Sequence, residues 1–287
     1  MDMIKNILKG IVIGLANIIP GVSGGTMMVS MGIYDKLIHC ITHLFKEFKK
    51  SILFLLPIAI GMVIAVAASA FVITDLFELF PLQTTLCFVG LIVGGLPAMW
   101  KNVKGNRIKP GHGIAFLLFF AAVVILALIG EKEGVSADLS FNLVNVLKLF
   151  GVGVIAAATM VIPGVSGSMM LLLLGYYNPI LSTVKEFIKT FIKVFKTHDI
   201  DGLIAGLGIL IPFGIGVVIG IFAVAKLIEI ILAKFPLYAY WAIIGLIVAS
   251  PIAIIAMGNF ASIGILTIVG GIVALAAGFI VAMKLGE

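Results

Sequence analysis

A proline-glycine break lies in the middle of an apolar segment of this chain, and it occurs twice. The first copy, from Asn17 to Thr26, reads Asn-Ile-Ile-Pro-Gly-Val-Ser-Gly-Gly-Thr. The second copy, from Met160 to Met169, reads Met-Val-Ile-Pro-Gly-Val-Ser-Gly-Ser-Met. Proline inside a helix removes a backbone hydrogen bond and clashes with the preceding turn, and the glycine that follows weakens the helix further. Each apolar segment is therefore predicted to break at its motif into two shorter helices.

Charged residues are confined to short clusters, and long apolar runs separate these clusters. Only 11% of the 287 residues are charged, against about 25% in soluble domains, and 62% are hydrophobic. The runs are long enough to cross about 30 Å of hydrocarbon, which takes about 20 helical residues. We therefore expect an all-α polytopic membrane protein. The net charge of +6 favours contact with anionic membrane lipids, and no nucleic-acid partner is expected, because the basic clusters lack interleaved aromatic residues.

The two motifs belong to a longer internal repeat, which is typical of transporter folds. Alignment of Pro20 with Pro163 continues downstream, where Phe80-Pro81-Leu82 corresponds to Phe235-Pro236-Leu237 and Gly90 to Gly245. The repeats are predicted at 1–138 and 139–287, each with a motif hairpin, a basic amphipathic stretch and three spans. In the first repeat these are 4–34, 36–50, 52–74, 82–100 and 113–130. In the second they are 145–177, 180–197, 203–225, 237–257 and 262–283.

The length of the motif segments bears on the topology. A continuous helix over 4–34 would measure about 46 Å, which is too long for one upright span. Two half-helices that form a re-entrant hairpin fit better, and one hairpin plus three crossings makes the two repeats inverted relative to each other. Four full crossings would make them parallel instead, and the positive clusters do not decide between these arrangements. We favour the inverted arrangement.

The motif carries the groups that neutral anion sites use. A half-helix that begins near Ser23 directs unpaired backbone N–H groups and its positive dipole end toward the protein centre. Glycines let an anionic group approach the backbone closely, and hydroxyl and amide groups add donors. The candidate phosphate-binding residues are Asn17, Gly21, Val22, Ser23, Gly24, Gly25 and Thr26 in one copy and Gly164, Val165, Ser166, Gly167 and Ser168 in the other. Candidate accessory residues are Thr159, Tyr34, Asp35 and Tyr177. In an inverted repeat the two tips would converge near the membrane midplane.

No charged side chain is expected deep in the apolar segments, so neutral dipoles and hydroxyls would hold the anion. Asp35 is the nearest carboxylate for proton coupling, although capping or solvation of the interface is its more common role. Tyr34 and Tyr177 are more often interfacial anchors than ligands. No cofactor or metal site is expected, because His39 and His43, four residues apart, have no third ligand in view.

The first motif is followed by Gly32-Ile-Tyr34 and the second by Gly175-Tyr-Tyr177. With these paired motifs the chain resembles the bacterial polyprenyl-phosphate transporter family along essentially its whole length. The resemblance implies a multi-pass protein of the bacterial cytoplasmic membrane. Such proteins return undecaprenyl phosphate, the lipid carrier for peptidoglycan and other envelope polymers, from the outer to the inner leaflet. The family often has Asp where this chain has Asn17, so this chain lacks that carboxylate. The oligomeric state stays open, with a homo-oligomer among the options.

Other interpretations of the motif are open. Glycine and serine in membrane helices often serve only close helix packing, although two copies in the same context argue against this. A channel or carrier for a small soluble anion is the main alternative to lipid transport. An intramembrane serine hydrolase is less favoured, because no histidine lies within a predicted span to act as the base. The chain is therefore not expected to be an enzyme.

Overall fold

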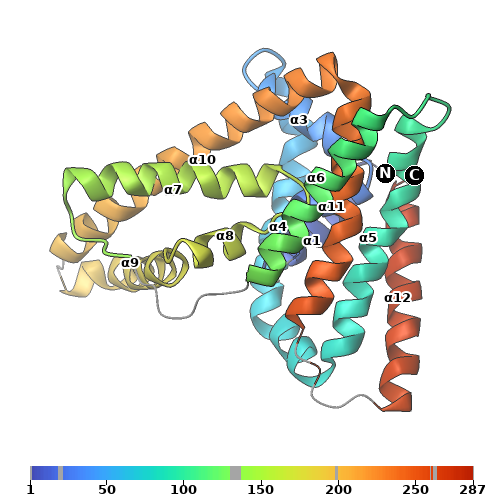
Figure 1. Cartoon of the computed structure of the whole chain (residues 1–287). Helices are drawn as coiled ribbons and strands as arrows, with labels where there is room; N and C mark the ends of the chain where they lie inside the picture. The colour runs from blue at the N-terminus through green and yellow to red at the C-terminus, as the bar shows by residue number, and fades with distance from the viewer. Residues whose placement is uncertain are drawn as a thin grey trace.

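The computed structural model describes residues 2–18, 22–129, 137–197, 200–258, 260 and 264–286, and these residues form twelve α-helices and no strand. The first half contains α1 (Asp2–Ile18), α2 (Gly24–Ser30), α3 (Tyr34–Thr42), α4 (Phe48–Leu79), α5 (Pro81–Val103) and α6 (Pro110–Ile129). The second contains α7 (Leu143–Val161), α8 (Gly167–Leu173), α9 (Tyr177–Thr197), α10 (Ile200–Lys234), α11 (Pro236–Met257) and α12 (Ile265–Gly286) (Figure 1). The same order of helices thus occurs twice.

Seven of the described helices are long and apolar enough to cross a membrane, namely α4, α5, α6, α7, α10, α11 and α12. Large apolar side chains are exposed along α6 and α12, including Leu117, Leu118, Ile272 and Val273. An exposed apolar surface of this kind suits hydrocarbon rather than water. The chain is therefore an all-α, multi-pass membrane protein.

Both motif segments are interrupted, as their prolines predict. In the first, α1 ends at Ile18 and α2 begins at Gly24; in the second, α7 ends at Val161 and α8 begins at Gly167. In Figure 1, α8 runs back beneath α7. Pro20 and Gly21 lie outside the described residues.

The amphipathic stretch predicted at 36–50 is shared between two helices. Helix α3 ends at Thr42, turns follow, and α4 already begins at Phe48. The His43 carbonyl accepts hydrogen bonds from the backbone N–H groups of both Lys46 (3.0 Å) and Glu47 (2.8 Å), which closes the turn. The corresponding stretch of the second half is the single helix α9. Helices α4 and α10 are also longer than the spans predicted for them, with 32 and 35 residues.

Equivalent helix crossings occur in the two halves. A Cβ on Gly10 of α1 would overlap the carbonyl oxygen of Ile58 in α4. A Cβ on Gly153 of α7 would likewise overlap the carbonyl oxygen of Phe213 in α10. Glycine permits these approaches because it has no side chain, and such contacts are common between membrane helices. The first two long helices of each half therefore pack in the same way.

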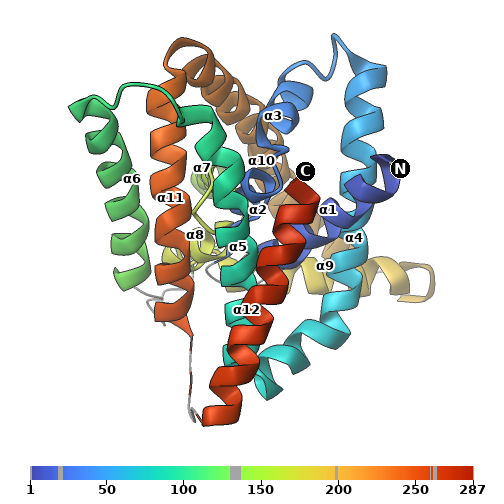
Figure 2. The same ribbon diagram turned by 90° about the vertical axis from the view of Figure 1, so that its right-hand side faces the viewer.

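The last helix of each half packs against the other half. Gly90 of α5 lies against the backbone of Leu275 in α12, and Gly245 of α11 lies against the backbone of Phe116 in α6. Figure 2 shows these two pairs, α5 beside α12 and α6 beside α11. The two halves are therefore interlocked rather than being separate units.

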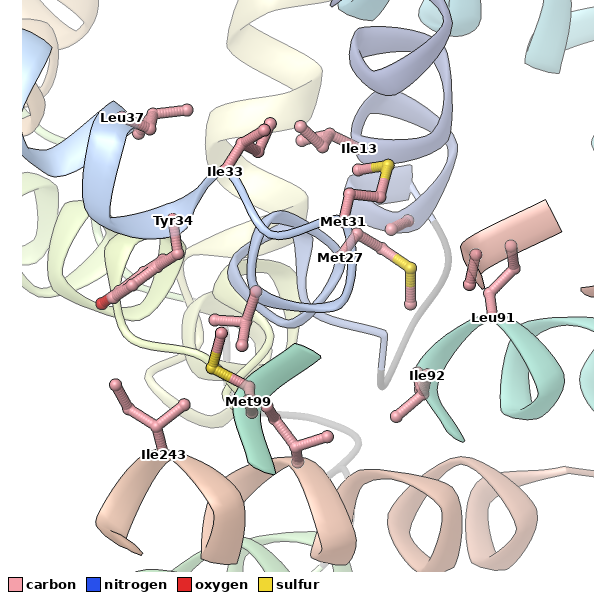
Figure 3. Close-up of a cluster of buried hydrophobic side chains, with 14 of the residues drawn as sticks. Ile13, Met27, Met31, Ile33, Tyr34, Leu37, Leu91, Ile92, Met99 and Ile243 are labelled. Atoms are coloured by element: carbon pink, nitrogen blue, oxygen red, sulfur yellow. The ribbon is translucent and has the colours of Figure 1, made fainter. Parts of the chain in front are cut away.

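The short helix α2 lies inside the protein. Met27, Val29 and Met31 are at most 1% exposed. Figure 3 shows the side chains of Met27 and Met31 among residues from α1, α3, α5 and α11, including Ile13, Leu37, Ile92 and Ile243. The first motif is thus carried on an element that the other helices enclose.

Candidate functional site

The two motifs meet directly. The backbone N–H of Gly164 donates a hydrogen bond to Oγ1 of Thr26 at 2.8 Å. Next to this bond, a Cβ on Gly25 would lie only 3.1 Å from Cα of Pro163. The two motifs are therefore in direct contact at these residues.

Ser23 is the N-cap of α2, and its hydroxyl has no partner. The residue is 4% exposed, and its Oγ is one of two buried side-chain polar atoms without a hydrogen bond in the described part of the chain. The other is Oε1 of Gln83 on α5. A buried hydroxyl without a partner costs about 1–3 kcal/mol, so such a group often marks a place that a ligand fills.

The second motif repeats this local geometry with one difference. Ser166 is the N-cap of α8, and its backbone is extended (φ −85°, ψ 127°), like that of Ser23 (φ −104°, ψ 127°). The Ser166 hydroxyl, however, lies 2.9 Å from the hydroxyl of Ser168. The residue of the first motif that aligns with Ser168 is Gly25, which has no hydroxyl. Ser23 therefore lacks the hydroxyl partner that Ser166 has.

The residues upstream of each break fold back on the helix that follows. A Cβ on Gly24 would overlap the amide oxygen of Asn17, which places that amide against the start of α2. In the second copy, Gly167 faces Met160, the residue that aligns with Asn17, and the Thr159 hydroxyl. That hydroxyl already donates to the Ala156 carbonyl at 2.8 Å. Asn17 thus lies at its tip as predicted, whereas the Thr159 donor is already engaged.

The two tips differ in their exposure. Val22, Ser23, Gly24, Gly25 and Thr26 are all buried, with Thr26 at 0%. In the second copy Gly164 and Ser166 are buried, while Val165, Gly167 and Ser168 are partly exposed. The structure therefore describes a conformation in which the first tip is closed off and the second is partly open.

Three accessory residues have different environments. Tyr34 is 2% exposed and donates from its hydroxyl to the carbonyl of Val161 at 3.1 Å, so its expected position as an interfacial anchor is wrong. Asp35 is exposed and accepts a hydrogen bond from the hydroxyl of Tyr240 at 2.9 Å. Tyr177, which aligns with Tyr34, begins α9 and is partly exposed. The first tyrosine thus joins α3 to the second motif segment.

Lys9 lies near the start of the first apolar segment, and it is buried although it is charged. This residue is 7% exposed, and its Nζ donates to the carbonyl of Met31 at 3.1 Å, at the end of α2. A cation there complements the negative end of the helix. The spacing of Lys9, Ile13 and Ala16 along one helix face could have indicated its burial. The residue that aligns with Lys9 in the second half is Val152, so the repeat itself does not indicate a buried charge at this position.

One group of side chains away from the motifs has the composition of a metal site. His39, His43 and Glu229 each offer a ligand atom, and these atoms lie within 4.8 Å of one another. Glu229 could not be recognised as a third member from the sequence, because it lies on α10 in the other half.

An apolar cavity of about 520 Å³ lies between α5, α11 and α12 and does not contain motif residues. Its lining is Val93, Leu96, Pro97, Trp100, Ile244, Val248 and Phe279. On α11, Leu246 contacts Gly164, whereas Ile244 and Val248 lie two positions away and so on the opposite helix face. The cavity is therefore separate from the junction of the motifs.

Comparison with known proteins gives a consistent result. A family model described as VCA0040-like, undecaprenyl phosphate translocase-like, matches residues 13–265. A polyprenyl-phosphate transporter of Staphylococcus aureus is 32% identical over 255 residues, which cover 87% of this chain and 85% of that protein. A polyprenyl-phosphate transporter of Vibrio cholerae is 32% identical over 219 residues, covering 71% of this chain and 68% of that protein. No solved structure gave a significant match.

Proposed function

The chain belongs to the VCA0040-like, undecaprenyl phosphate translocase-like family, and on that basis we propose that it moves polyprenyl phosphate between the two leaflets of the bacterial cell membrane. Its relatives are named as transporters, and the protein is a transporter rather than an enzyme. The proposed role is the return of the lipid carrier used to build envelope polymers. In this proposal the phosphate binds at the junction of the two motifs.

The observation that carries this assignment is the Ser23 hydroxyl, which is buried and without a partner at the start of α2. Phosphate oxygens would accept a hydrogen bond from it. Asn17, whose amide lies against Gly24, adds a donor beside it. A phosphate at this position would therefore satisfy a group that the protein alone leaves unsatisfied.

Local donors would contribute more than the helix dipoles. Helices α2 and α8 have only seven residues each, so their dipoles are short. The backbone N–H groups of their first turns, together with Ser23 and Ser166, remain the main donors in the proposal. A neutral set of donors also lets the phosphate leave, which a transporter requires.

Release of the phosphate would need the tips to separate. The bond between Thr26 and Gly164 and the burial of the first tip both hold the site closed. Helix α1 crosses α4 in the same way as α7 crosses α10. Two halves built alike in this way suit a mechanism in which they move in alternation. We infer that the repeats are inverted and that each motif forms a re-entrant hairpin, so that each leaflet is served in turn.

The isoprenoid tail would stay in the hydrocarbon while the head group crosses. Only the charged phosphate faces a barrier in the membrane, because burial of an unpaired charge costs several kcal/mol or more. The protein therefore needs to shield the head group, and no enclosure is needed along the length of the tail.

The test is binding and transport of a polyprenyl phosphate by Ser23→Ala in proteoliposomes. Hydrogen bonds to charged groups contribute about 1.5–3 kcal/mol, so affinity is expected to fall by about 10- to 150-fold. The same change removes an unsatisfied buried hydroxyl, so the thermal unfolding midpoint should be unchanged or higher. Loss of binding without loss of stability would distinguish a ligand contact from a structural one.

Ser250→Ala is the matched control. Its hydroxyl is also buried, but it donates to the Leu246 carbonyl within α11. This variant should transport like the wild type. Unchanged binding by Ser23→Ala would contradict the proposed site, and uptake of inorganic phosphate without movement of the lipid would contradict the proposed substrate.

A further inference from the structure

Three side chains with metal-binding chemistry meet where the two halves contact each other. His39 and His43 lie four residues apart at the end of α3, and their rings stack with centroids 4.2 Å apart. Oε1 of Glu229, from α10, lies 3.6 Å from Nδ1 of His39 and 3.3 Å from Nδ1 of His43. One carboxylate oxygen thus faces both imidazoles.

We propose that His39, His43 and Glu229 bind a divalent transition-metal ion such as Zn²⁺. Two imidazoles and one carboxylate form a common three-residue ligand set for this ion, with water in the fourth position. Bonds of about 2.0–2.1 Å place tetrahedral ligand atoms about 3.3–3.4 Å apart. The two observed nitrogen–oxygen distances are close to that value.

Neighbouring side chains fix the orientation of the ligands. The other oxygen of Glu229, Oε2, accepts a hydrogen bond from Nζ of Lys226 at 2.6 Å. Oε1, which faces the histidines, accepts one from the Thr42 hydroxyl at 3.0 Å, and that hydroxyl also lies 3.0 Å from Nδ1 of His43. On its far side, Nε2 of His39 lies 3.9 Å from a carboxylate oxygen of Glu47. A carboxylate behind a ligating histidine is the usual outer partner in zinc sites.

The position of the group is suitable for capture of an ion from water. The side chain of His39 is 50% exposed, that of His43 26% and that of Glu229 21%, so the site is accessible but not fully solvated. Helix α3 follows α2 after a short turn, whereas α10 belongs to the second half. A bound ion would therefore link the segment that carries the first motif to the other half of the protein.

The test is titration of tag-free purified protein in detergent with Zn²⁺, with Co²⁺ as a spectroscopic substitute. We expect saturation at about one ion per chain, visible absorption bands of four-coordinate Co²⁺, and a higher thermal unfolding midpoint with Zn²⁺. Loss of an outer partner typically costs 10- to 100-fold in metal affinity, so removal of a direct ligand in Glu229→Gln should cost at least about tenfold. His43→Gln should have a similar effect.

Glu186→Gln is the matched control. Glu186, like Glu229, pairs with a lysine three residues away, but on α9. Its substitution should leave Zn²⁺ affinity unchanged. The proposal is overturned if the wild type does not saturate near one ion per chain, or if Glu229→Gln binds Zn²⁺ as tightly as the wild type. No lipid is needed in this experiment, so its outcome is independent of the proposed transport function.

Discussion

Thr26 accepts a hydrogen bond from the backbone N–H of Gly164, across 138 residues of sequence, and so joins the two copies of one motif. Thr26 is fully buried, and Gly164 has a positive φ of 82° that few other residues adopt. The contact is between unlike atoms, a side chain from one copy and a backbone group from the other. The two tips are therefore related in sequence but not identical in their interactions.

Thr26→Val should destabilise the protein. Valine has nearly the same shape but no acceptor, so the buried N–H of Gly164 would lose its partner at a cost of about 1–3 kcal/mol. Thermal or denaturant unfolding in detergent would measure this. Thr26→Ser keeps the hydroxyl and should lose less stability. A loss in Thr26→Ser as large as that in Thr26→Val, or larger, would contradict the leading role given to the hydrogen bond.

Gly25→Ala should push the tips apart. Its Cβ would lie 3.1 Å from Pro163 Cα, and the neighbour is backbone that cannot turn away. We expect lower transport in proteoliposomes, because a shift of Pro163 would strain the neighbouring bond between Gly164 and Thr26. Gly151→Ala, on α7, is the control, since nothing lies within 4 Å of its Cβ position. Transport by Gly25→Ala equal to that of the control would be evidence against a shared site.

The Pro-Gly motifs predicted the break in each segment because proline and glycine act locally on the backbone. The sequence also predicted the order of spans, since each needs only about 20 apolar residues. It could not predict that α12 packs on α5 and α6 on α11, because long apolar helices offer many faces that could form such a contact. Packing between halves is decided by close backbone contacts at residues such as Gly90 and Gly245.

The contacts of the candidate site could be predicted only where a local motif carries them. The motif alone indicates that Ser23, Asn17 and Thr26 lie close together. The bond from Tyr34 to Val161, however, depends on the fold of both halves. The burial of Lys9 was not expected, because a lysine near the start of an apolar segment is usually placed at the interface. Glu229 was missed because 186 residues separate it from His43 in the sequence, and no motif links them.

Tyr34→Phe should have a larger effect than Tyr177→Phe, although the two tyrosines align in the repeat. The Tyr34 hydroxyl is buried on the Val161 carbonyl, and loss of that bond should cost about 0.5–1.5 kcal/mol, with more if the carbonyl is left unpaired. Tyr177 is partly exposed, so its variant should unfold at nearly the wild-type temperature. The unfolding midpoints of the two variants provide the comparison, and a greater loss for Tyr177→Phe would contradict it.

Gly10→Ala and Gly153→Ala should destabilise the protein to a similar extent. Each Cβ would overlap a backbone carbonyl of the helix crossed, on α4 and α10 respectively. Overpacking of this kind typically costs about 1–3 kcal/mol. Gly214→Ala has open space around it and serves as the control. A large loss in one variant and none in the other would argue against equivalent crossings in the two halves.

The most direct measurement is an experimental structure of the protein with a polyprenyl phosphate bound. We predict a phosphate oxygen within about 2.5–3.0 Å of Ser23 Oγ, beside Asn17 and facing the second motif. A phosphate held at the membrane surface, far from both Ser23 and Ser166, would contradict the central claim.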